Sequence, residues 1–277
     1  MPAALLPADD HVHSEFSWDT GPHASMRDAC ARAVELGVPA VAFTEHVDFT
    51  RWSPGDVPLV PDHRPRDPGW YQPVDVQPYL ASIEACRGEF RGLRVRAGIE
   101  TGEPHLFAGS VAQVLAQGPF ERVLGSLHSV VRHDELVGVG RVLRSEHPHE
   151  VVREYFGELL EMVRGSAVFE VLAHCDFPRR YWPDRRNPYQ ERDFEDEYRA
   201  VFGALAASDR VLEVNTTSPL SSVRLLRWWR ESGGRRVSFG SDAHVPWNVG
   251  QHFVQARDVV ERAGFRAGRD PGDFFRV

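Results

Sequence analysis

The sequence predicts an α/β fold in which strand–helix units surround a parallel sheet. Short apolar runs rich in Val, Ala and Phe alternate with longer amphipathic stretches, which is typical of such units, and we count seven of them. The chain has 277 residues, a length that suits one α/β barrel. No linker separates two halves of different composition, so we expect a single domain over residues 1–277.

The seven strands are expected where the short apolar runs occur, over 8–13, 38–44, 94–100, 121–127, 168–173, 210–215 and 236–241. Helices are expected between them, over 25–36, 75–91, 106–117, 148–164, 191–207, 220–232 and 249–263. Capping residues support three of these helices. Ser25 precedes the first helix and Gly37 follows it, Asp75 opens the second, and Pro148 begins the helix over 148–164.

Two segments do not fit the alternation. Residues 50–74 are dense in Pro, Gly, Trp and Asp and have no helical or strand period, so we expect a long loop, and loops of that length are often functional. Residues 129–147 form a second insertion and contain VGVGR. Its two glycines lack the third glycine and the strand context of a dinucleotide-binding fingerprint, so we give this motif no weight.

The composition excludes several chemistries. All 32 basic residues are Arg, because the chain has no Lys. A Walker A phosphate loop, a kinase, a pyridoxal-phosphate enzyme and a Schiff-base aldolase each require a specific amine and are therefore excluded. The net charge of −8 argues against long nucleic acid or an anionic membrane as a partner. Because Arg alone must solubilise the surface, a cluster of Arg is a solvated face by default.

Cysteine usage and the amino-terminal segment indicate a cytoplasmic protein. Cys30, Cys86 and Cys175 are far apart and odd in number, which argues against a disulfide framework or a Cys-type zinc site. The segment MPAALLPADD has no basic region before its short apolar stretch, and no later run approaches the ~18 apolar residues of a membrane span.

Polar side chains gather where the predicted strands end. In a parallel barrel these ends open onto one face of the fold, so residues far apart in the sequence meet there. His11 and His13 are two residues apart at the end of the first strand, so their side chains point to the same side of the extended chain. The complete set of candidate groups is His11, His13, Asp19, His46, Glu100, His128, His174, Asp242 and His244.

This set predicts a polynuclear metal centre. A single His at a strand end is usually an ordinary buried or surface residue, but these nine imidazoles and carboxylates would crowd charge together unless cations neutralised it. Nine nitrogen and oxygen donors suit roughly two or three divalent ions, and Zn, Mn and Fe all accept this mixture. We expect His63, His133, His147 and His149 on the surface and His105 at the start of a helix, whereas His23 and His252 are expected near the rim.

Seven motifs resemble the polymerase and histidinol phosphatase (PHP) superfamily. They are DDHVHSEFSWD, AFTEH, GIETG, LGSLHSV, VLAHCDF, LEVNTTS and FGSDAH, and the resemblance covers the chain from about residue 8 to residue 255. Their order and spacing are most similar to the histidinol-phosphatase branch. The resemblance implies a distorted seven-stranded (β/α)7 barrel with a trinuclear metal site.

All nine candidate groups fall on ligand positions of that family. The resemblance implies that His11, His13, Glu100 and Asp242 hold one ion, that His128 and His174 hold a second with Glu100 as the bridge, and that Asp19, His46 and His244 hold a third. Glu15 and Glu45 lie outside the pattern, so we expect them to support the ligands or the structure around them.

The resemblance also implies the activity, a phosphatase acting on a small phosphomonoester. We expect conversion of L-histidinol phosphate to L-histidinol and phosphate, by attack of a metal-bridging hydroxide with Glu100, Asp242 and His244 as the catalytic groups. Arg179 or Arg180 would hold the phosphate as a planar fork. The sequence does not decide which group protonates the leaving alcohol, nor the oligomeric state.

One departure from the family concerns substrate binding. The family usually places an Arg shortly after the asparagine that corresponds to Asn215, whereas here Asn215 is followed by TTSPLSSV and the next Arg is Arg224. Arg224, Arg185 and His252 are candidates for a compensating group, and a substrate other than L-histidinol phosphate is the alternative.

Three other functions are weighed against this hypothesis. A PHP phosphodiesterase or exonuclease would act on nucleotides or short oligonucleotides, although the acidic composition argues against long nucleic acid. An amidohydrolase barrel also begins with H-x-H, but many of its members need a carboxylated Lys that this chain lacks. A non-catalytic binding module would not need the complete ligand set.

Overall fold

The computed structural model describes residues 6–50, 74–217 and 220–277 of the chain. Their main sheet has eight strands in the order β1-β2-β3-β4-β7-β8-β9-β10. The bounds are β1 Asp9–Val12, β2 Ala40–Val47, β3 Arg94–Gly102, β4 Arg122–Ser126, β7 Val171–Leu172, β8 Val211–Asn215, β9 Arg236–Gly240 and β10 Phe275–Arg276. The first seven pair in parallel at the seven predicted positions, which confirms the α/β fold.

The sheet curls into a half-barrel that closes at one end only. Val12 forms an isolated parallel bridge with Ala243, and the Asp242 amide donates to the His11 carbonyl at 2.8 Å. At the opposite end of β9, Val237 pairs with Phe275 of the antiparallel strand β10. The seven-stranded barrel is therefore distorted, as predicted, and the eighth strand was not anticipated. Closure occurs at the carboxyl ends of β1 and β9, where the candidate ligands follow.

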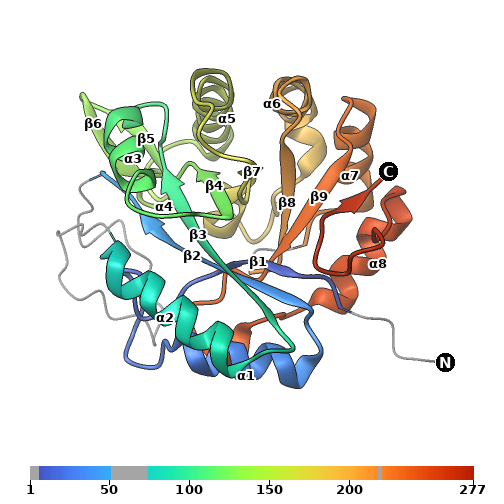
Figure 1. The fold of residues 1–277 in the computed structure, drawn as a ribbon. Coiled ribbons are helices and arrows are strands. Elements are labelled where there is room, and N and C mark those ends of the chain that lie inside the picture. Colours follow the sequence, from blue (N-terminus) through green and yellow to red (C-terminus); the bar gives the residue numbers. More distant parts are fainter. Residues whose placement is uncertain (1–5, 51–73, 218–219) are drawn as a thin grey trace.

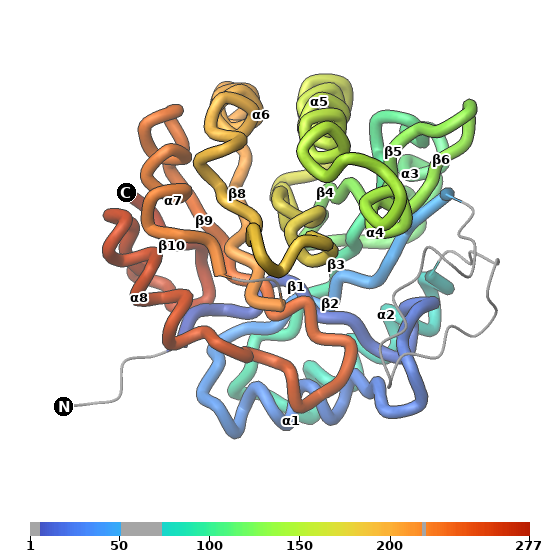
Figure 2. Tube along the Cα trace, turned by 180° about the vertical axis from the view of Figure 1, so that it is seen from behind, coloured from blue at the N-terminus to red at the C-terminus, as the bar shows by residue number. Residues whose placement is uncertain are grey.

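Helices surround the curled sheet, with α1 and α2 on one side and α5, α6 and α7 on the other (Figure 1; Figure 2 shows the reverse side). Their bounds are α1 Met26–Leu36, α2 Val76–Glu89, α3 Ala108–Leu115, α4 Val139–Val142, α5 Pro148–Gly165, α6 Glu195–Ala207, α7 Val223–Glu231 and α8 Phe253–Ala263. Short 3₁₀ helices are η1 Phe177–Tyr181, η2 Glu191–Phe194 and η3 Pro246–Asn248. Within the described residues, no helix combines the length and hydropathy that crossing a membrane requires.

The capping signals act largely as predicted. The Ser25 side chain accepts a hydrogen bond from the Asp28 amide, and Gly37 ends α1 with a φ of 74° in the left-handed region. Asp75 directly precedes α2 but makes no capping hydrogen bond through its side chain. The helix predicted over 191–207 begins as η2 and continues as α6.

The insertion over 129–147 contains a hairpin that the sequence analysis did not anticipate. Strands β5 Ser129–Arg132 and β6 Glu135–Gly138 pair in antiparallel fashion and are followed by α4. His133 and Asp134 form the turn with φ values of 52° and 64°, as a type I′ turn requires. The sequence His-Asp is a weak signal for such a turn, since Asn-Gly and Asp-Gly are preferred. The predicted loop over 50–74 lies outside the described residues, apart from its two ends.

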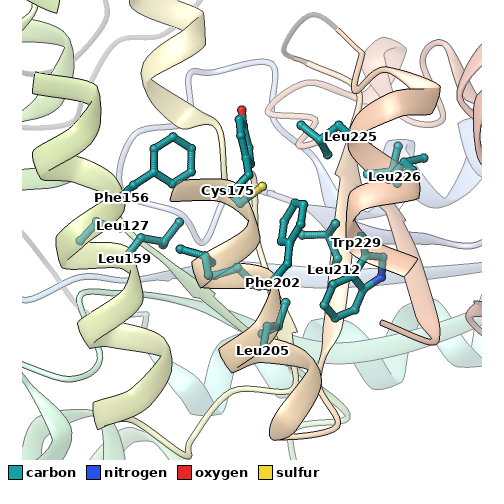
Figure 3. Packing of buried hydrophobic residues seen from close by; sticks show 14 of the residues in the cluster. Leu127, Phe156, Leu159, Cys175, Phe202, Leu205, Leu212, Leu225, Leu226 and Trp229 are labelled. Carbon is teal, nitrogen blue, oxygen red and sulfur yellow. The ribbon is translucent and has the colours of Figure 1, made fainter. Parts of the chain in front are cut away.

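Packing of large apolar side chains holds the strand ends in place. In one core cluster, Leu212 of β8 packs with Phe202 and Leu205 of α6 and with Trp229 of α7 (Figure 3). Trp229 is fully buried, and its indole donates to the Arg236 carbonyl at 3.0 Å. Each such side chain contributes about 1.5–3 kcal/mol to folding. This packing gives β8 a rigid base beneath the site.

Candidate metal centre

The carboxyl ends of the strands bring the nine candidate ligands together on one rim. His11 lies on β1, His46 on β2 and Glu100 on β3, whereas the others follow β1, β4, β7 and β9 in short loops. Seven of the nine are buried, and Asp19 and His244 keep side-chain exposures of only 13% and 12%. The placement follows from the parallel topology, because every strand of such a sheet delivers its last residues to the same edge.

Glu100 lies at the centre of the cluster. Its Oε1 is 2.7 Å from His174 Nε2 and 3.3 Å from His128 Nε2. Its Oε2 is 3.1 Å from His46 Nδ1 and 3.3 Å from His11 Nε2. One carboxylate thus faces imidazoles from four other segments, as expected of a group that bridges metal ions.

His11 and His13 lie beside Asp242. Their Nε2 atoms are 3.1 Å apart, and Asp242 Oδ1 is 3.6 Å from the first and 3.4 Å from the second. Asp19 lies on the other side of the cluster, with Oδ2 at 3.3 Å from His46 Nε2 and 3.0 Å from His244 Nε2.

Three groups of donor atoms are close enough to share an ion. Within each group the atoms lie within 4.8 Å of one another, and the groups are His11–His13–Asp242, His11–Glu100–His174 and His13–His46–His244. His11 and His13 each belong to two groups, so they lie between neighbouring candidate positions. The allocation of each ligand to one ion stays a prediction.

Burial and charge suit these residues to hold cations. The Oδ1 atom of Asp19 and the Oε2 atom of Glu100 are buried without a hydrogen-bond partner among the described residues. Such atoms are costly to bury, and a divalent cation would compensate them. Although burial raises carboxyl pKa values, neighbouring imidazoles hold the pKa of both groups well below the ordinary range. Anionic oxygens and imidazole nitrogens form a donor set that fits divalent transition metals.

The imidazoles of the cluster differ in protonation. Burial lowers the pKa of His13 to about 3, with the rings of His244 and His46 contributing, so its lone pair is available at neutral pH. Burial also opposes charge on His11, but the carboxylates around it, with Glu213 foremost, raise its pKa well above the ordinary value. Protons on such rings compete with metal ions for the same nitrogen atoms.

The two candidate phosphate-binding arginines occupy different environments. Arg180 Nη2 lies 2.6 Å from Asp242 Oδ2 and 3.0 Å from Asn215 Oδ1, directly beside the ligand cluster. Arg179 instead forms ion pairs with Asp176 at 3.3 Å and Glu191 at 3.1 Å. The structure therefore brings Arg180, rather than Arg179, into contact with the ligands.

The remaining candidate substrate-binding groups lie on the surface. His252 is exposed and directly precedes α8, and Arg185 and Arg224 are exposed as well. His23, also expected near the rim, lies beside Trp247 with the ring centroids 5.9 Å apart. Within the described parts of the chain, no hydrogen bond or ion pair joins these four side chains to the nine ligands.

Comparison with known proteins agrees with this geometry. The model of the PHP domain matches residues 9–217. The chain belongs to the PHP family. It is 24% identical over 265 residues to a histidinol-phosphatase of Lactococcus lactis, covering 93% of this chain and 91% of that protein. It is 26% identical over 273 residues to a probable histidinol-phosphatase of Deinococcus radiodurans, with coverages of 93% and 94%.

A solved PHP structure has the same fold. The crystal structure of the histidinol phosphate phosphatase from Lactococcus lactis, complexed with zinc, L-histidinol and phosphate, superimposes with a TM-score of 0.79. It is 23% identical and covers 95% of each chain. These comparisons confirm the predicted family and its PHP-type half-barrel.

Two carboxylates noted in the sequence, Glu45 and Glu15, make defined contacts in this PHP chain. Glu45 accepts hydrogen bonds from the hydroxyls of Ser14 and Ser17, each at 2.6 Å, and Ser17 Oγ lies 2.9 Å from His13 Nδ1. Glu15 accepts from the Met26 amide at 2.6 Å, at the start of α1. Glu45 thus supports a candidate ligand through Ser17, whereas the contact of Glu15 with α1 is structural.

Other residues that support the PHP site had not been predicted from the sequence. Glu103 accepts hydrogen bonds from the backbone amides of His128 and Ser129 at 2.9 Å and 3.0 Å, which fixes the backbone that carries His128. Asp48 and Glu213 also lie against candidate ligands. The available signal was weak, because Glu213 lies between apolar residues of β8 and outside the ligand pattern.

Backbone strain marks two of the candidate ligands. His174 has a φ of 20° and Asp242 a φ of 52°, both in the region that favours glycine. Such conformations cost about 1–3 kcal/mol each and cluster at functional sites of proteins. In this PHP chain, His174 follows β7 and Asp242 follows β9, where these backbone conformations accompany the entry of each side chain into the cluster.

Proposed function

We propose that this chain is a metal-dependent phosphatase that hydrolyses L-histidinol phosphate to L-histidinol and phosphate. The observation that carries the proposal is the cluster of nine ligand-type side chains with Glu100 at its centre, where five imidazoles face this carboxylate and the guanidinium of Arg180 lies beside Asp242. The relatives named above are histidinol-phosphatases over most of their length. The Lactococcus lactis structure was solved with L-histidinol and phosphate, which supports this substrate class.

Two or three divalent ions, with Zn, Mn or Fe as candidates, would be held by the nine ligands. When bound, such ions lower the pKa of water towards neutrality and offset the negative charge of a phosphoryl group. The chemistry therefore requires no nucleophilic side chain from the protein.

The side chains of the chain orient the ligands and bind the phosphate in this proposal. His244 Nδ1 lies 3.0 Å from the Asp242 carbonyl, which can only accept, so Nδ1 carries the proton and Nε2 faces Asp19. With that tautomer, His244 would bind an ion through Nε2. Arg180 carries a fixed positive charge next to Asp242, where its planar fork suits a phosphate.

The test is a substrate screen with metal analysis on the same sample. Phosphomonoesters that include L-histidinol phosphate are compared with phosphodiesters, short oligonucleotides, amides and lactones. We expect the highest kcat/KM for L-histidinol phosphate, and loss of activity when the ions are removed by a chelator. Preference for a phosphodiester or for an amide would replace the proposal with the corresponding alternative, and activity that survives complete metal removal would overturn it.

A further inference from the structure

Among the seven parallel strands, β8 is the one whose end contributes no predicted ligand, yet it directs two buried polar side chains towards the cluster. Glu213 and Asn215 alternate along β8 and therefore face the same side of the sheet. Their exposures are 3% and 4%, so neither serves solubility. Buried polar groups are retained where they form specific hydrogen bonds, and these two form a network.

Glu213 joins two candidate ligands on different strands. Its Oε1 lies 2.7 Å from Nδ1 of His11, which is on β1. Its Oε2 accepts a hydrogen bond from the backbone amide of His174 at 2.7 Å and another from Asn215 Nδ2 at 3.1 Å. One carboxylate thus holds the ring of His11 and the strained backbone of His174.

Asn215 extends the network to a third ligand. Its Nδ2 lies 3.3 Å from Asp242 Oδ2, and its Oδ1 accepts from Arg180 Nη2 at 3.0 Å. The amide orientation is determined by these partners, because the guanidinium can only donate and the carboxylates can only accept. Asp242 Oδ2 is therefore bound by Asn215 and Arg180. Oδ1 is the atom that faces His11 and His13.

The contact with Glu213 determines which nitrogen of His11 can bind a metal. A carboxylate accepts, so His11 Nδ1 must carry the proton in this pair. Nε2 then keeps the lone pair, and this atom lies 3.3 Å from Glu100 Oε2 within the cluster. Metal-binding histidines commonly donate their second N–H to a carboxylate, which fixes the ring and its tautomer.

We propose that Glu213, together with Asn215, is the positioning pair of the metal centre. Glu213 holds His11 in the Nδ1–H tautomer, and Asn215 directs Asp242 Oδ1 towards the ions. The inference rests on the proposed metal-dependent function and assigns a role to the strand that carries no ligand.

Because of the hydrogen bonds that Glu213 accepts, we expect that an amide cannot replace its carboxylate. Glu213 accepts three hydrogen bonds through two oxygens. In Glu213→Gln one oxygen becomes an NH₂ group, which would face either the N–H of His11 or the amide of His174. Size and burial are nearly unchanged, so the substitution removes the acceptor selectively.

The first experiment measures metal affinity by competition with a chelator, using Zn(II) and Co(II) as probes. We expect Glu213→Gln to weaken affinity about 10- to 100-fold, the usual effect of removing such a partner, and to change the visible spectrum of bound Co(II). Glu170→Gln is the matched control. Glu170 directly precedes β7 at the other end of the barrel and pairs with Arg122 at 3.2 Å, away from the ligands. The control should bind both metals as the unmodified protein does.

The second experiment observes the tautomer directly. In Zn-loaded protein labelled with ¹⁵N-histidine, the His11 signals, assigned by their loss in His11→Gln, should show a proton on Nδ1. A proton on Nε2 would overturn the proposal, as would unchanged metal affinity in folded Glu213→Gln. If Glu213→Gln does not fold, Asn215→Ala tests the pair, because it should weaken metal binding through Asp242 while leaving Glu213 in place.

These outcomes are separate from those of the proposed function. Metal affinity and the His11 tautomer do not depend on which phosphate ester is the substrate. A protein that requires metal for phosphatase activity, yet binds metal equally well as Glu213→Gln, would refute the positioning role alone. A protein that binds no divalent ion would refute both.

Discussion

Replacing Arg180 with Ala tests the phosphate-binding role most directly. Arg180 is 16% exposed at its side chain, lies 2.6 Å from Asp242 Oδ2, and stacks over the Phe177 ring at 5.0 Å. These contacts hold the guanidinium beside the candidate ligands. A substrate phosphate bound at the metal centre would therefore meet a fixed planar donor rather than a mobile surface charge.

The expected magnitude follows from the bonds that would be lost. A hydrogen bond to a charged group contributes about 1.5–3 kcal/mol, which corresponds to roughly a 10- to 150-fold decrease in kcat/KM. The decrease should appear as a higher KM and a lower kcat, because the guanidinium contacts the phosphate in both the ground and the transition state. Asn215 still contacts Asp242 Oδ2 at 3.3 Å, so the metal content should not change.

Arg179→Ala is the matched control, since it removes the same side chain one residue away. Arg179 pairs with Asp176 and Glu191, so its loss should lower stability by about 1–3 kcal/mol and leave kcat/KM unchanged. Steady-state kinetics on L-histidinol phosphate, thermal unfolding and metal analysis distinguish the two variants. Wild-type kcat/KM in Arg180→Ala would refute the reasoning, and a kinetic defect confined to Arg179→Ala would transfer the role to Arg179.

Other predictions concern the metal centre. Elemental analysis should find more than one divalent ion per chain, and chelation should abolish activity. Glu100→Gln should lower metal content and activity by at least about 10-fold, because an amide cannot bridge two ions with the same charge, and full activity would remove Glu100 from the bridge. Burial lowers the pKa of His11 and His46, but the neighbouring carboxylates raise it by more, so both pKa values lie above the ordinary value. Metal uptake near pH 7 should therefore release protons. Calorimetry in buffers of different ionisation enthalpy would detect this release. In the metal-free protein, the raised pKa values of His11 and His46 add stability that is fully present below about pH 6.5. This contribution is lost as the pH rises through the raised pKa values, so the Tm of the metal-free protein should fall above neutrality. A constant Tm would contradict these protonation states.

The strand positions and the shared rim could be predicted because both follow from local patterns. Apolar runs mark the parallel strands, and the topology then requires their carboxyl ends to meet. Residues as distant as His11 and Asp242 could therefore be placed together without knowledge of any contact. Each of the seven parallel strands overlaps the range predicted for it.

The distinction between Arg179 and Arg180 could not be predicted. The two residues are adjacent in η1, and successive side chains of a 3₁₀ helix point in directions about 120° apart. One guanidinium reaches Asp242 and the other reaches Glu191, and neither partner is close in the sequence. Sequence proximity to His174 was equal evidence for both.

The positioning role of β8 could not be predicted either, because the partners of Glu213 and Asn215 are distant in the sequence. Gly240 shows which feature of the sequence makes this role possible. Asn215 pairs in register with Gly240, which precedes Asp242 by two residues. A Cβ at Gly240 would lie 2.0 Å from Glu213 Oε1 and 2.6 Å from the Cβ of His11. Any side chain there would displace the carboxylate from its contact with His11. The glycine of FGSDAH and the glutamate of LEVN are therefore parts of one structural feature, in which the first provides the space that the second occupies.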